Sequence, residues 1–312
     1  MSFTMGQKLL SYLLEDDLMN QDQIYHLESE FIRVSVTKQG AGLLSIFDLE
    51  SYVEYLWQGH PTLNPWKPQI IFPIVGKLKD DQYWLGRKYY HMQKDGFLKD
   101  LQFEVKNHRK DRITFVHTNS PDTELIFPFR YSIEVTYMVY GPKLTVSFVI
   151  KNLDKKEMFF SLGFAPTFNV PLGPEGHDDC FIEFSTQEER GAYFLENDLV
   201  NFHDADNKKV VQDCRVFFTQ ENFRGGEMVF KDIKSKSIAL KNILNEKSVN
   251  IDLGNIPYLS IWTYPGANFV RIAPAFGVTD ALDSNNDFYT KEGLIDLEQE
   301  KTFKHEFVFH IR

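Results

Sequence analysis

Alternation between apolar and polar residues with a period of two is the dominant pattern along this chain. Between residues 131 and 139 every second residue is apolar, and serine, glutamate and threonine stand among the residues between them. The dipeptide Gly141-Pro142 then interrupts the run, and the alternation resumes between residues 144 and 150. A period of two is typical of a strand with one buried face, and a Gly-Pro pair marks a turn. The segment therefore predicts a β-hairpin.

The same alternation recurs near the C-terminus and in several shorter runs. Between residues 303 and 311, four apolar residues and His305 share one face of an extended segment. Shorter runs of the same kind lie at residues 31–36, 113–117 and 256–262. Many short strands separated by glycine, proline and asparagine favour two packed sheets. The fold class that the pattern predicts is an all-β sandwich.

Helical spacing is confined to the N-terminal segment. The leucines at positions 9, 10, 13, 14 and 18 recur at the spacing of one helix face, and the segment ends in an acidic, polar stretch. We therefore expect residues 1–29 to form a helical arm or extension. No internal repeat, low-complexity tract or Pro/Ser-rich linker divides the remainder. Residues 30–312 are expected to form a single β-sandwich domain.

Composition and charge narrow the classes of partner. Hydrophobic residues make up 43% of the 312 residues and charged residues 25%, the balance of a globular protein with a sizeable core. A formal net charge of −10, with lysine and arginine scattered along the chain, argues against nucleic acid and against an anionic membrane surface. The apolar stretch at residues 9–14 is too short for a membrane span. We therefore expect a cytoplasmic protein with no nucleic-acid partner and no membrane partner.

Motifs for the common cofactors are missing from the sequence. It contains no glycine-rich phosphate loop, no paired Cys/His metal spacing and no Gly-x-Ser-x-Gly elbow, so we expect no cofactor and no metal. Cys180 and Cys214 lie far apart without metal-type spacing, which is typical of free thiols in a reducing compartment. The 28 Phe, 14 Tyr and 4 Trp residues supply rings for the core and platforms for the C–H faces of sugars.

Four segments, taken together, resemble a known family. The first comprises YLWQ at residues 55–58 and IFPIVGKLKD at residues 71–80; the others are DGFLKD at 95–100, GFAPTFNVPL at 163–172, and YLSIW at 258–262 with FVRIAPAFG at 269–277. In order and spacing they are similar to the motifs of the aldose 1-epimerase (mutarotase) family, in particular its LacX-like branch. The resemblance covers about residues 30–312. It implies a large galactose-mutarotase-like β-sandwich.

The resemblance also implies an activity. The family interconverts the α and β anomers of free aldoses without a cofactor: a glutamate base removes the proton of the anomeric hydroxyl while a histidine acid protonates the ring oxygen. Each group of this kind typically contributes about 10²–10⁴-fold to the rate. The implied partner is a small-molecule sugar, an aldohexose such as galactose or glucose, bound in a cleft.

The chain departs from the family at the positions that handle protons. Ala273 stands where the family has its glutamate, Ala165 where it has one histidine, and Asp95 where it has a second histidine. The scaffold motifs around these positions are kept. The pattern therefore implies a catalytically impaired or inactive carbohydrate-binding homologue, a pseudoenzyme of carbohydrate metabolism. Of the three residues, only Asp95 retains a group that can act as an acid or a base.

Further positions match sugar-binding positions of the family. Gly226 falls where the family has a sugar-binding aspartate, with Glu227 beside it, and Lys77 replaces an arginine. Asp280 matches an aspartate of relatives, for which a structural role in its loop is the simpler interpretation. The full set of expected sugar-binding positions is Trp66, Lys77, Asn169, Gly226, Trp262 and Asp280.

Two alternatives to a non-catalytic sugar binder remain open at this point. The first is an active mutarotase with a substitute acid–base pair, Asp95 with a nearby histidine such as His177. The second is a structural or interaction module that assembles through the N-terminal arm. The scattered Lys and Arg residues predict no clustered basic pocket, which argues against a sugar phosphate as ligand.

Overall fold

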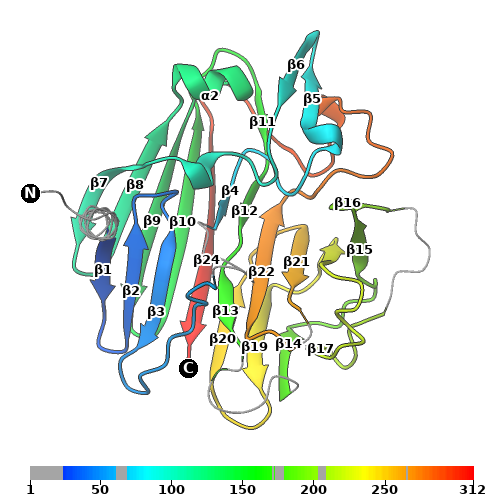
Figure 1. Ribbon diagram of the computed structural model, residues 1–312. Coiled ribbons are helices and arrows are strands. Elements are labelled where there is room, and N and C mark those ends of the chain that lie inside the picture. Colours follow the sequence, from blue (N-terminus) through cyan, green and yellow to red (C-terminus); the bar gives the residue numbers. More distant parts are fainter. Residues whose placement is uncertain (1–23, 61–68, 171, 173–178, 203–208, 265) are drawn as a thin grey trace, which may run out of the picture.

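A computed structural model describes residues 24–60, 69–170, 172, 179–202, 209–264 and 266–312. The regular structure of the described chain is almost all strand, and most strands belong to two large antiparallel sheets (Figure 1). The only α-helix in this part is α2 (Pro121–Ile126), and short 3-10 turns lie at η1 (Lys79–Asp81), η2 (Leu98–Asp100) and η4 (Phe288–Thr290). None of the described helices has the length and apolar character that crossing a bilayer needs. The predicted all-β sandwich is confirmed.

The first large sheet has nine strands. In spatial order they are β17 (Arg215–Phe217), β14 (Cys180–Phe184), β19 (Ser237–Asn242), β20 (Ser248–Asp252), β24 (Thr302–Ile311), β10 (Lys143–Asn152), β9 (Tyr131–Tyr140), β8 (Arg112–Thr118) and β7 (Glu104–Arg109). The predicted hairpin is confirmed as β9 and β10, which pair from Tyr140 and Lys143 onward. Alternate residues of β9 are buried, because a strand points successive side chains to opposite faces.

The second large sheet has eight strands. Seven of them follow the order β16 (Leu199–Val200), β15 (Tyr193–Glu196), β18 (Met228–Lys231), β21 (Tyr258–Trp262), β22 (Phe269–Phe276), β12 (Leu162–Phe164) and β4 (Ile70–Ile71). The eighth, β13 (Thr167–Asn169), pairs with β22. Strand β22 therefore has β21 on one side, and β12 and then β13 on the other. Side chains of β22 that point away from the core therefore lie over the centre of this sheet.

Aromatic side chains join the two large sheets in the core. The ring of Phe164 on β12 stacks 6.2 Å from the ring of Phe307 on β24 and lies 5.9 Å from Phe148 on β10. All three side chains are fully buried. Burial of one such side chain stabilises the fold by about 1.5–3 kcal/mol. The core between the sheets thus fixes the position of strand β22 relative to the rest of the molecule.

Smaller sheets complete the described chain. Strands β1 (Ile24–Glu28), β2 (Ile32–Thr37) and β3 (Leu43–Asp48) form one; β5 (Gln82–Leu85) with β6 (Lys88–His91), and β11 (Met158–Phe160) with β23 (Ile295–Leu297), form two more. Strand β1 packs on β8, where Tyr25 meets Phe115 at 5.9 Å between ring centres. Residues 24–28 were expected to belong to the helical arm, so the β-structure begins before the expected boundary at residue 30. The remainder of that arm, residues 1–23, lies outside the described residues.

Candidate functional site

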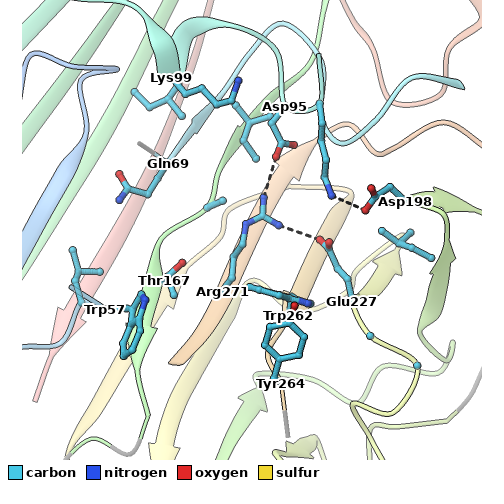
Figure 2. Close-up of a pocket in the computed structure, with 18 residues that line it drawn as sticks. Trp57, Gln69, Asp95, Lys99, Thr167, Asp198, Glu227, Trp262, Tyr264 and Arg271 are labelled. Atoms are coloured by element: carbon cyan, nitrogen blue, oxygen red, sulfur yellow. Dashed lines mark hydrogen bonds and ion pairs between the residues drawn. The ribbon is translucent and has the colours of Figure 1, made fainter. Parts of the chain in front are cut away.

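A cavity of about 520 Å³ opens over the centre of the eight-stranded sheet, where β22 meets its neighbours (Figure 2). Its size lies in the range of small-molecule sites, on the order of 300–1,000 Å³. The aromatic and charged residues among those that line it form three chemical groups. The aromatic group is Trp57, Trp262 and Tyr264; the cations are Lys94, Lys99 and Arg271; the carboxylates are Asp95, Asp198 and Glu227.

Arg271 occupies the middle of the cavity between two carboxylates. Its Nη1 lies 3.1 Å from Oε1 of Glu227, and its Nη2 lies 3.6 Å from Oδ2 of Asp95 (Figure 2). The side chains of Arg271, Asp95 and Glu227 are only 20%, 20% and 15% exposed. Removing charges from water is costly unless they are paired, so the guanidinium stabilises both carboxylates at this depth. Strand pairing sets Arg271 opposite Thr167 on one side and Trp262 on the other.

The loop before η2 holds Asp95 in a defined position. Its Oδ1 accepts a hydrogen bond of 2.9 Å from the backbone N–H of Gly76, and its own N–H donates to the carbonyl of Gly76 at 2.9 Å. Asp95 and Gly96 both have left-handed backbone conformations, with φ of +64° and +69°. A Cβ atom on Gly96 would lie 1.9 Å from the carbonyl oxygen of Phe72. Only glycine allows this close approach, which aims the Asp95 carboxylate at the cavity.

The two alanines at the expected catalytic positions form an apolar patch. Ala165 and Ala273 are buried and cluster with Ile71, and the partly buried Val75 packs against them. Ala165 lines the main cavity, whereas Ala273 lines a small adjoining hollow of about 20 Å³. A methyl group can neither donate nor accept a proton. The surface where the resemblance places a glutamate and a histidine is therefore chemically inert.

The two lysines of the cavity also face oxygen atoms. Lys94 Nζ lies 2.8 Å from Oδ1 of Asp198, and this hydrogen bond lowers the pKa of that carboxyl below its usual value. Lys99 Nζ donates to the carbonyl of Gly96 at 2.7 Å and to Asp100 at 2.8 Å. The structure thus gathers three cations that look scattered in the sequence, but it pairs each of them within the protein.

The aromatic residues form one end of the cavity. The rings of Trp57 and Trp262 lie 5.2 and 5.4 Å from the ring of Phe269, which is almost fully buried beneath them. Tyr264 lies 4.9 Å from Trp262 in an edge-to-face contact. Figure 2 shows Trp262 and Tyr264 below Arg271, with Asp95 and Lys99 above it. The cavity therefore has a polar end and an aromatic end.

The sequence-predicted positions separate into two groups. Asp95, Ala165, Gly226 and Trp262 all line the main cavity, and Ala273 lines the adjoining hollow. The lining of the cavity and of the hollow does not include Lys77, Asn169 or Asp280. Trp66 and His177 lie outside the described residues.

Asn169 and Asp280 have polar partners within the fold. Asn169 Nδ2 donates to the carbonyls of Glu54 and Leu56 at 2.7 and 3.0 Å, which fastens the start of the YLWQ segment. Asp280 Oδ1 lies 2.8 Å from Lys291 Nζ in an ion pair whose side chains are 4% and 3% exposed. The other oxygen of Asp280 accepts a hydrogen bond from the backbone N–H of Lys79. These contacts match the structural interpretation of Asp280.

The backbone of Lys77 is hydrogen-bonded to the segment that contains Thr279 and Asp280. Its N–H donates to Thr279 Oγ1 at 3.0 Å, and its carbonyl accepts from the N–H of Asp280 at 2.9 Å. Its charge also helps to lower the pKa of Asp198, although less than Lys94 does. The side chain thus influences the rim of the cavity through its charge.

Sequence reasoning missed Arg271, Trp57, Lys94, Lys99 and Asp198 as cavity residues. One of these carried a usable signal. Arg271 precedes Ala273 by two residues within a strand, so the two side chains share a face. Trp57, Lys94 and Asp198 lie on loops and turns, and Lys99 lies in the short turn η2, where no periodic pattern indicates the direction of a side chain.

Comparisons with known proteins point to one family. The family model "Aldose 1-epimerase" matches residues 23–305. Protein LacX (chromosomal) of Lactococcus lactis subsp. lactis is 26% identical over 278 residues, which cover 83% of this chain and 90% of the relative.

Solved structures give the same result. A galactose mutarotase related enzyme from Lactobacillus acidophilus is similar with a TM-score of 0.87 at 27% identity, covering 93% of this chain and 97% of the other. A galactose mutarotase-like protein from Lactobacillus casei is similar with a TM-score of 0.84 at 28% identity, covering 93% and 100%. The chain belongs to the aldose 1-epimerase family and, within it, to the LacX-like branch.

Proposed function

We propose that this protein binds a free, neutral sugar in the cavity over β22 and does not catalyse rapid interconversion of its anomers. One observation carries the proposal. The cavity combines hydrogen-bonding groups with aromatic rings, whereas the two family positions for the base and one acid hold Ala273 and Ala165 in an apolar patch. Its role is that of a carbohydrate-binding member of an isomerase family.

The absence of catalysis follows from what the lining groups can do. Anomer interconversion needs a proton acceptor at the anomeric hydroxyl and a proton donor at the ring oxygen. The guanidinium of Arg271 carries hydrogen-bond donors and no acceptor, so it can donate hydrogen bonds to a sugar but cannot accept its proton. Asp95 is engaged with Gly76 and with Arg271. Among the described lining residues there is no histidine.

The binding of a neutral sugar follows from the chemistry of the same groups. Sugar hydroxyls both donate and accept hydrogen bonds, and Arg271 supplies donors beside the acceptors of Asp95 and Glu227. Hydrogen bonds to charged groups are stronger than those between neutral groups. The faces of Trp57 and Trp262 suit the C–H faces of a pyranose. The formal charges of the described lining residues balance, which favours an uncharged ligand.

A second candidate is an active mutarotase. The observation that favours it is that two carboxylates, Asp95 and Glu227, line the cavity and contact different nitrogen atoms of Arg271. They would replace the expected pair of Asp95 and a histidine. In this alternative, the substrate displaces the guanidinium from one of the carboxylates. The rate of anomer interconversion separates the two candidates, because only the active mutarotase raises it well above the rate in buffer alone.

The cellular setting is part of the same proposal. We place the protein in the cytoplasm, without nucleic-acid or membrane partners. The net charge of −10 disfavours polyanionic surfaces, and Cys180 and Cys214 are not joined in a disulfide.

Calorimetric titration with galactose and with glucose tests the binding. We expect saturable binding of at least one sugar, weakened about tenfold by Arg271→Ala and by Glu227→Gln, because each removes charged hydrogen-bond partners. Glu183→Gln is the matched control, since Glu183 pairs with Arg215 and Lys241 outside the cavity. The proposal fails if folded wild-type protein binds neither sugar, or if Glu183→Gln weakens binding as much as Glu227→Gln does.

A further inference from the structure

We infer that the natural ligand is a neutral glycan of at least two sugar rings, with one ring at Arg271 and the next on an aromatic wall formed by Trp57, Trp262 and Tyr264. The inference rests on the proposed function and goes beyond it by naming a second subsite and the class of ligand. The sugar ring at the aromatic end of the cavity is then a ring that is bound but whose anomers are not interconverted.

The shape of the cavity is the first argument. Its volume of about 520 Å³ is of the size that encloses drug-sized ligands, and a single pyranose is smaller than these. Figure 2 shows Asp95 and Lys99 on one side of Arg271, and Trp262 and Tyr264 on the other. A single ring that makes hydrogen bonds to Asp95 and Arg271 leaves the far aromatic end in contact with water. A second ring fills that end.

The construction of the aromatic wall is the second argument. Phe269 is almost fully buried and supports both tryptophans, with ring centres 5.2 and 5.4 Å away. Tyr264 is 51% exposed, although it lies beside Trp262 on the same wall. Aromatic rings held rigidly with an exposed face lose little entropy when a ligand stacks on them. Such a wall suits the C–H face of a sugar ring.

Charge gives the third argument and limits the ligand to neutral glycans. Lys94 pairs with Asp198 at 2.8 Å, and Arg271 pairs with Glu227 at 3.1 Å. A phosphate or carboxylate on the ligand would have to replace a protein carboxylate and then lie beside it, and like charges at short distance repel. Sugar hydroxyls can join both ion pairs without breaking them.

The apolar patch gives the last argument. Ala165 lines the main cavity with a methyl group where the family resemblance places a histidine. The smaller side chain leaves room beside the first ring. No group at Ala165 or Ala273 requires a free anomeric hydroxyl, so a glycosidic oxygen can occupy that place.

The test is a calorimetric comparison of monosaccharides with disaccharides. Galactose, glucose and their methyl glycosides are titrated alongside lactose, maltose and cellobiose. We expect at least one disaccharide to bind about tenfold or more tightly than its monosaccharide, a factor that corresponds to about 1.4 kcal/mol. Tyr264→Ala should remove most of this advantage and change monosaccharide affinity less than about threefold, and Trp262→Ala should weaken disaccharide binding more than monosaccharide binding. Trp262→Phe, which keeps a ring, should retain most of the advantage.

Trp84→Ala is the matched control, because Trp84 is an exposed tryptophan on the β5–β6 hairpin and does not line the cavity. Tyr264→Ala guards against misfolding, since this side chain is half exposed. Equal affinity for one and two rings, or equal losses for both ligand classes in the aromatic variants, would overturn the inference and leave the proposed function standing. Failure of every sugar to bind the folded wild type would overturn both.

Discussion

Arg271 and Ala273 lie two residues apart on strand β22 and both face the hollow over the eight-stranded sheet. A permanent cation thus stands beside the position where the family resemblance places the catalytic glutamate. The cation is balanced by Asp95 at 3.6 Å and Glu227 at 3.1 Å. The site therefore holds an ion cluster and a patch of methyl groups at the positions where the family resemblance places proton-transferring groups.

Restoring the family residues should create catalysis. We expect the triple variant Asp95→His, Ala165→His and Ala273→Glu to anomerise α-galactose at least tenfold faster than the wild type, because each restored group typically contributes about 10²–10⁴-fold. Polarimetry of freshly dissolved sugar measures this rate. The variant with only Asp95→His is the control and should stay slow. A folded triple variant with the rate of the wild type would show that the lost side chains do not limit the reaction.

The ion pair between Asp280 and Lys291 should stabilise the fold without affecting sugar binding. Both side chains are almost fully buried. Lys291→Met leaves a buried carboxylate without its partner, so we expect the free energy of unfolding to fall by about 3–5 kcal/mol. Asp280→Asn combined with Lys291→Met should recover part of this loss. Urea denaturation measures stability and sugar titration measures affinity; an affinity change of tenfold or more in the folded double variant would instead make Asp280 a ligand contact.

Gly96 should be essential for the placement of Asp95. A Cβ atom at this position would lie 1.9 Å from the Phe72 carbonyl oxygen, so we expect Gly96→Ala to cost more than about 3 kcal/mol of stability. Gly86→Ala is the matched control. Its φ of +62° is close to the +69° of Gly96, but nothing lies within 4 Å of the added Cβ, so only the backbone strain of about 1–2 kcal/mol remains. Equal losses in thermal denaturation would contradict this account of the loop.

Stability should fall in mild acid because of His305. Burial lowers the pKa of this imidazole to about 4, against the backbone hydrogen bond with Leu253 that raises it, and Phe276 and Phe307 pack against the ring. The unfolded chain takes up the proton near pH 6.5, whereas the folded protein takes it up only near pH 4. Stability is therefore complete above about pH 6.5 and falls as the pH drops toward 4.

The size of this acid effect should be between about 1 and 3 kcal/mol, since one unit of pKa difference corresponds to about 1.4 kcal/mol and the ring is only partly shielded from solvent. Urea denaturation between pH 4 and pH 7 measures it. His305→Gln should flatten the dependence, whereas His310→Gln, on the same strand, should not. Identical pH profiles for the wild type and His305→Gln would show that other groups cause the acid sensitivity.

The sequence allowed much of the fold to be predicted. Strands such as β9 and β10 have one buried face and one exposed face, so their alternation is a local property of the chain. The start of the β-structure was placed too late, because β1 is short and only partly buried and follows a segment with helical spacing.

The site was less accessible to sequence reasoning. The ion cluster is assembled from residues near positions 95, 227 and 271, and no local pattern reports that these three segments meet. Asp95 and Ala165, which the family resemblance singled out, both line the cavity. The resemblance could not indicate that Asn169 has hydrogen-bond partners inside the fold, because that depends on the neighbours the side chain meets. The structural interpretation of Asp280 agrees with its buried ion pair.

The most direct test of the account follows the anomers of α-galactose and α-glucose by NMR, with and without protein, in freshly dissolved samples. Line broadening in the same spectra reports binding. We predict broadened sugar signals and anomer interconversion at the rate of the buffer alone. Interconversion well above the buffer rate, lost in Asp95→Asn, would contradict the central claim and would make Asp95 a working acid or base of an active mutarotase.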